Sequence, residues 1–104
     1  MIPRRRRFAD AIERQLDLFE RDHAGLIADC RAALRGYDRA PRDEAEERYG
    51  DYVDLVETAT ELLGELRDGY ARTLDEETAE SYVAAFNRAV GKRLPEFSLE
   101  IEDV

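Results

Sequence analysis

Residues 45–70 have the sequence AEERYGDYVDLVETATELLGELRDGY. Apolar side chains recur in this stretch at alternating steps of four and three residues, which is the spacing of one face of a long amphipathic helix. The residues on that face are Ala45, Tyr49, Tyr52, Val56, Ala59, Leu63, Leu66 and Tyr70. The stretch therefore predicts a long helix whose apolar face has to be covered by a neighbouring helix.

Residues 12–37 carry the same spacing earlier in the chain. Their apolar face consists of Ile12, Leu16, Phe19, His23, Leu26, Cys30, Ala33 and Tyr37. Two such stretches in succession predict a long antiparallel helical hairpin with a shared apolar seam. The chain of 104 residues has only three prolines and six glycines, so the predicted fold class is all-α.

Capping signals place the ends of three predicted helices. We expect these helices at about residues 7–35, 41–73 and 75–94. Gly36 suits a left-handed C-terminal cap, Pro41 suits the first turn of the second helix, and Asp75 is a good N-cap for the third. Residues 1–94 are therefore expected to form a single three-helix domain.

The third predicted helix is too short to cover the hairpin. At a rise of about 1.5 Å per residue the first two helices are each about 45 Å long and the third about 28 Å. Val53, Leu55 and Leu62 also widen the apolar face of the second helix. We therefore expect a helical bundle that is completed by self-association, in the form of a homodimer, with a helical partner protein as the alternative occupant. The predicted interface comprises Ile12, Leu16, Phe19, Tyr52, Leu55, Val56, Leu62, Leu63, Leu66 and Tyr70.

The segment 95–104 has a different pattern. Phe97, Leu99 and Ile101 alternate with polar residues, which is a period of two residues and not 3.6. This alternation predicts an extended tail that either folds back over the bundle or is offered to another molecule.

The charge distribution limits the classes of partner. The net charge is −9, and an acidic surface repels nucleic acid and anionic membranes. The run Arg4–Arg7 is the one feature that favours phosphate, so weak nucleic-acid binding remains a third hypothesis. No apolar run approaches the roughly 20 residues of a membrane span, and no apolar segment follows the N-terminal arginines as in a signal peptide. We expect a cytoplasmic protein.

Few residues are suited to chemistry. The chain has one histidine, one cysteine and two serines, and we predict no catalytic residue and no cofactor. The exception is the Glu-x-x-His step formed by Glu20 and His23, which resembles the metal-binding step of ferritin-like di-metal proteins over four residues. Two such pairs across a dimer interface would bind iron, manganese or zinc. The opposing interpretation of His23 is a packed histidine within the apolar seam. The main functional prediction is a non-catalytic interaction or scaffold protein.

Overall fold

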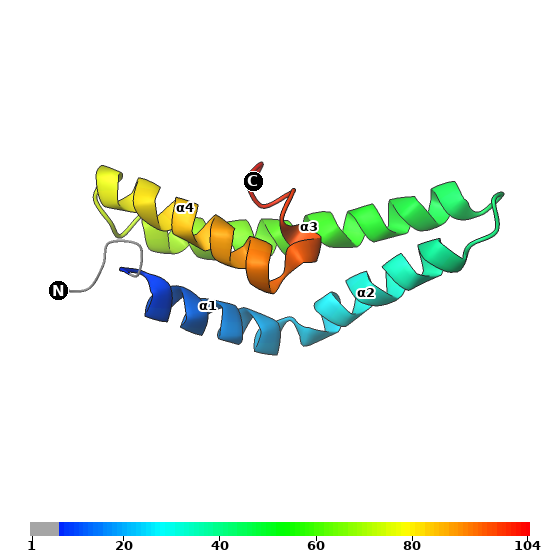
Figure 1. Ribbon diagram of the computed structural model, residues 1–104, viewed down its shortest axis with the longest axis horizontal. Coiled ribbons are helices and arrows are strands. Elements are labelled where there is room, and N and C mark those ends of the chain that lie inside the picture. Colours follow the sequence, from blue (N-terminus) through cyan, green and yellow to red (C-terminus); the bar gives the residue numbers. More distant parts are fainter. Residues whose placement is uncertain (1–6) are drawn as a thin grey trace.

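The computed structural model describes residues 7–104, and within that range every regular element is a helix. The elements are α1 (Ala9–Asp22), α2 (Ala24–Arg39), α3 (Ala45–Ala71), α4 (Glu76–Arg93) and a single 3-10 turn, η2 (Pro95–Phe97). The predicted all-α class is confirmed. The molecule is elongated, with extents of 56 × 22 × 20 Å, and α3 runs along most of its length (Figure 1).

The first predicted helix, about residues 7–35, begins close to the expected position, at Ala9, but the prediction is wrong in its middle and at its C-terminal end. It is divided at His23, whose φ and ψ of −120° and 29° are not helical, and α1 and α2 meet there at an angle (Figure 1). The nearby Gly25 has a low helix propensity, so interrupting the helix at this point costs little free energy. Gly36 does not cap the helix, because α2 continues to Arg39 and no glycine has a positive φ. The bend turns α1 towards α4 while α2 remains on α3.

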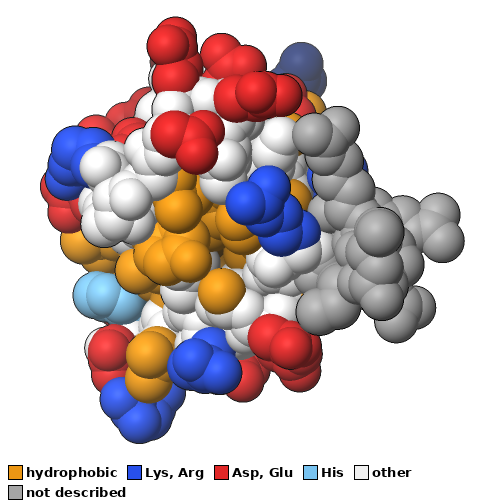
Figure 2. Space-filling view, turned by 90° about the vertical axis from the view of Figure 1, so that its left-hand side faces the viewer, with side chains coloured by type: hydrophobic (Ala, Val, Ile, Leu, Met, Phe, Trp, Pro, Cys, Tyr) orange, Lys and Arg blue, Asp and Glu red, His pale blue; other side chains and the backbone are white. Residues whose placement is uncertain are grey.

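The main core lies where α1, α4, η2 and the C-terminal half of α3 pack together. Its largest fully buried apolar side chains are Leu16, Leu63, Tyr82, Phe86, Val90, Leu94, Phe97 and Ile101. The Tyr82 hydroxyl donates a hydrogen bond to Gln15 Oε1 at 2.7 Å, so the one polar atom of this buried ring is satisfied. Seen end-on, apolar side chains fill the centre of this end of the molecule and acidic ones line its upper edge (Figure 2).

The start of α4 follows the sequence signal, whereas the start of α3 is later than expected. Asp75 caps α4, since its Oδ1 accepts a hydrogen bond from the Thr78 N–H at 2.9 Å. Pro41 does not begin a helix. Residues 41–44 form a turn in which the Glu44 N–H donates to the Pro41 carbonyl at 2.9 Å, and α3 begins at Ala45.

The C-terminal segment 95–104 is not the extended tail that the alternating pattern predicts. It consists of η2 and further turns, in which the Ile101 N–H donates to the Phe97 carbonyl at 3.0 Å. Residues four apart in such turns lie on the same side, so Phe97 and Ile101 are both buried while Leu99 is 84% exposed. The period of two in the sequence therefore coincides with a helical spacing of four.

Arg67 on α3 holds this segment in place. Its side chain is only 5% exposed, and its guanidinium donates to the carbonyl oxygens of Ile101 (2.8 Å) and Val104 and to Asn87 Oδ1 (3.0 Å). Asp68 supplies the counter-charge at 2.8 Å. The carbonyls of a turn that lacks a following helix thus obtain donors from a buried arginine.

Candidate protein-interaction surface

The helical hairpin of α2 and α3 extends well beyond the rest of the molecule. We call residues 32–54 the arm, and the remaining described residues the body. No residue of the arm is buried, whereas all buried residues of the described chain lie within 8–30 and 56–101. Figure 1 shows the two helices of the arm running side by side without a third element over them.

An ion pair lies at the junction of arm and body. Arg31 Nε on α2 is 3.1 Å from Glu96 Oε1 on η2, and the Glu96 side chain is mostly covered. Arg31 is the last residue of α2 with a hydrogen bond to η2. The ion pair therefore connects α2 to η2 directly beside the first residue of the arm.

The arm exposes large apolar and aromatic side chains. Leu34 is 37% and Tyr49 51% exposed, and both rank among the most exposed large apolar residues of the described chain. The rings of Tyr37 and Tyr49 have centroids 5.2 Å apart, and those of Tyr49 and Tyr52 6.4 Å apart. These rings pack on each other at the surface, an arrangement typical of protein-interaction surfaces.

Two weakly acidic side chains, Cys30 and Tyr52, lie near the base of the arm. Burial raises the pKa of the Cys30 thiol, and the nearby carboxylates of Glu96 and Asp29 raise it further. The pKa of Tyr52 is also raised, first by burial and then by the neighbouring Cys30 and Glu96. Both groups therefore stay protonated near pH 7, so neither the buried Cys30 nor the partly exposed Tyr52 adds a charge at this point.

The residues predicted for the interface fall into two groups. Five are buried within the chain's own core: Ile12, Leu16, Phe19, Val56 and Leu63. The other five are partly buried and pack against that core from its edge: Tyr52, Leu55, Leu62, Leu66 and Tyr70. The first group is covered by intramolecular packing, because α1 folds onto α4, which the prediction of an unbroken first helix did not include.

Two residues of the exposed surface were missing from the predicted interface. Leu34 lies beside the regular spacing of residues 12–37, and Tyr49 lies on the regular spacing of residues 45–70. The sequence signal that identifies them is the short third predicted helix, which leaves this end of the hairpin without cover.

The structure does not bring the predicted metal ligands Glu20 and His23 into a metal site. Glu20 accepts hydrogen bonds from Arg93 at 3.0 and 3.2 Å, and Asp17 pairs with the same guanidinium. These contacts raise the pKa of Arg93. His23 lies at the helix break with its ring 4.8 Å from that of Phe19. Among residues 7–104 no group of three potential ligands is close enough to hold a metal ion.

The N-terminal arginine run lies largely outside the described residues, which exclude Arg4, Arg5 and Arg6. Arg7 is exposed, and its guanidinium carbon is 5.5 Å from the centroid of the Phe8 ring. In the part of the chain that the structure describes, no helix has both the length and the apolar character needed to cross a bilayer.

No protein-family model matches the chain, and no curated protein or solved structure is detectably similar to it. The exposed face of the arm, together with its charges, is therefore the basis for assigning a role.

Proposed function

We propose that this protein is an interaction protein that self-associates through its arm, with the arms of two copies packing into a four-helix bundle. The observation that carries the proposal is the length of the arm without buried side chains, 23 consecutive residues. Most of the stability of a helix in a protein comes from packing of its apolar face. The two helices of the arm have no third element over them, so they gain little stability from packing. A second hairpin would cover their exposed apolar side chains.

The charges of the arm favour a second copy as the occupant. The arm portion of α2 carries Arg35 and Arg39 on its outer side, whereas that of α3 carries mainly acids, including Asp51 and Asp54. In the proposed dimer the two-fold axis sets α2 of one copy against α3 of the other, and the symmetry makes these two contacts equivalent. Basic side chains then face acidic ones on both sides of the dimer, and this pairing steers the arms into register.

Sedimentation equilibrium tests the proposal. The wild-type protein is expected to have twice its monomer mass of 12.0 kDa at micromolar concentration. Tyr49→Glu and Leu34→Glu place a charge on the exposed face of the arm and should each weaken dimerisation by at least about a hundredfold, since burying an unpaired carboxylate costs several kcal/mol.

The matched control is Leu18→Glu, because Leu18 on α1 is a leucine of similar exposure, 42%, outside the arm. It should leave the mass unchanged. A wild-type protein that remains monomeric, or a Tyr49→Glu variant that dimerises as tightly as Leu18→Glu, would contradict the proposal.

A further inference from the structure

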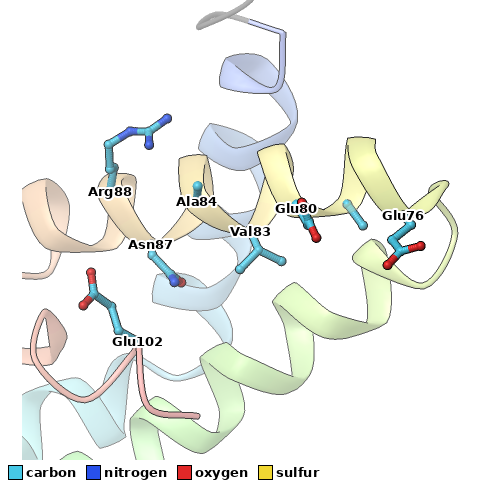
Figure 3. A pocket seen from close by; sticks show the side chains of 8 residues that line it. Glu76, Glu80, Val83, Ala84, Asn87, Arg88 and Glu102 are labelled. Atoms are coloured by element: carbon cyan, nitrogen blue, oxygen red, sulfur yellow. The ribbon is translucent and has the colours of Figure 1, made fainter.

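The outer face of α4 carries a second ordered surface, separate from the arm. Every fourth residue along this helix is exposed, in the order Glu76, Glu80, Ala84, Arg88 and Lys92. Figure 3 shows the part of this row from Glu76 to Arg88 crossing the helix obliquely, with Glu76 near one edge of the face and Arg88 at the other. A row of side chains at this spacing forms one of the inclined ridges through which helices pack on one another.

A shallow apolar groove flanks the ridge on each side. One is lined by Ala79, Val83 and Asn87, with Glu102 of the C-terminal segment as its far wall (Figure 3). The other lies between α1 and α4 and has Ile12, Leu16, Ala85 and Ala89 among its lining residues. The small side chains beside the ridge leave room for the ridge of another helix.

The charges along the ridge are symmetric about Ala84 but opposite in sign. Glu80 and Arg88 lie four residues before and after it, and Glu76 and Lys92 lie eight residues before and after it. Acids near a helix N-terminus and bases near its C-terminus also complement the helix dipole, but that effect is confined to the first and last turns. It does not account for Glu80 and Arg88.

These four charges have no ion-pair partner among residues 7–104, where the ion pairs involve other side chains. Arg93, the neighbouring base, is by contrast held by Asp17 and Glu20. The ridge thus presents two acids and two bases to a partner.

We infer that α4 binds the α4 of a second copy in antiparallel orientation, with the two-fold axis passing beside Ala84. In this arrangement Glu80 of each copy faces Arg88 of the other, and Glu76 faces Lys92. When ridges of residues four apart pack into the matching grooves, the two helices cross at about −50°, and the ridges then run parallel to each other along the whole contact. Ala84, at the centre, allows the helices to approach closely.

This surface and the arm are independent, because they lie on different elements. A molecule with two self-complementary surfaces associates beyond a dimer, into chains or closed assemblies of dimers. The contact through α4 is expected to be the weaker of the two, since its charges are exposed and screened by salt.

Charge exchange tests the contact in the Tyr49→Glu background, in which the arm is disabled. Dimerisation is measured by sedimentation equilibrium at low ionic strength. Glu80→Arg or Arg88→Glu alone should weaken it about tenfold, because each change converts two attractive pairs of the symmetric dimer into repulsive ones. The double variant Glu80→Arg/Arg88→Glu should restore the wild-type affinity, since the antiparallel pairing is regenerated with exchanged signs.

Helix propensity does not produce this rescue, because Glu80 and Arg88 are eight residues apart and do not contact each other within one helix. Failure of the double variant to recover association would overturn the inference, as would the absence of any association in this background at low salt. If the arm is not an interface, Tyr49→Glu associates as strongly as the wild type. The charge exchange on α4 still tests the α4 contact in that case, so failure of one proposal can be distinguished from failure of the other.

Discussion

The body and the arm are built from parts of the same two helices, yet only the body has an interior. In the body α3 packs against α2, α4 and η2, and every buried side chain of the described chain lies there. In the arm no side chain of the same two helices is buried, and Tyr49 is half exposed. The difference shows that the apolar spacing of a helix specifies where cover is needed but not whether the same chain supplies it.

The largest expected difference between the two regions is the cost of removing an aromatic ring. Phe86→Ala in the body should lower the free energy of unfolding by about 3–5 kcal/mol, because the ring is fully buried and leaves a cavity. Tyr49→Ala in the arm of the isolated monomer should cost less than about 1 kcal/mol. Urea denaturation at a concentration below dimerisation measures both, and equal losses would contradict the division into body and arm.

Arg67 extends this comparison to the C-terminal segment. Arg67→Met retains the volume of the side chain but removes the donors to Asn87, Ile101 and Val104, so we expect a loss of about 3 kcal/mol. The exposed Arg72 is the matched control, and Arg72→Met should cost little. Limited proteolysis should then cut the Arg67→Met protein within residues 98–104. An uncut segment would show that η2 holds itself without the guanidinium.

Some features of the fold follow from the local sequence and others do not. The apolar spacing of residues 45–70 predicts the helix α3, and Asp75 predicts the start of α4, because both depend on local geometry. The bend at His23 does not follow from the spacing, since His23 occupies a regular position within it. The burial of Arg67 cannot be predicted from the local sequence either, because its hydrogen-bond partners Ile101 and Val104 are more than thirty residues away.

The same limit applies to the candidate surfaces. The spacing identifies the residues that require cover, but Leu16 and Leu63 obtain it from their own chain, whereas Tyr49 does not. The Glu20–His23 step has the spacing of a metal site, and within one chain Arg93, seventy-three residues away from Glu20, donates a hydrogen bond to the Glu20 carboxylate. Contacts between residues far apart in the sequence determine the surroundings of these side chains, and the apolar spacing does not predict such contacts.

Alkaline pH should destabilise the body through Tyr82. Burial raises the pKa of its hydroxyl to about 12 from an ordinary value of 10.0. The protonated hydroxyl therefore contributes stability that is fully present below pH 10 and is lost as the pH rises through 12, by on the order of 2 kcal/mol. Urea denaturation between pH 9 and 12 measures the decline. Tyr82→Phe should be less stable at pH 9 but should show a shallower decline, and an equally steep one would exclude Tyr82 as its source.

The smallest expected effect distinguishes the glycines of the two regions. A Cβ at Gly50 in the arm meets no atom within 4 Å, so Gly50→Ala should stabilise α3 by about 0.5–1 kcal/mol. At Gly64 in the body a Cβ would lie 3.0 Å from Val104 Cγ2, and Gly64→Ala should give none of this gain. Thermal unfolding followed by circular dichroism compares the two. A gain at Gly64 as large as at Gly50 would show that the C-terminal segment moves freely.

Hydrogen exchange resolved by mass spectrometry tests most directly whether a second copy covers the arm. The wild-type protein and Tyr49→Glu are compared at the same concentration, with the body of each serving as the internal reference. We expect amides of residues 32–54 to be protected in the wild type and to exchange at least about a hundredfold faster in Tyr49→Glu, while those of residues 82–94 are unchanged, because only the arm loses its partner. Arm amides that are equally protected in both proteins would contradict the account, since the hairpin would then be stable without a second copy.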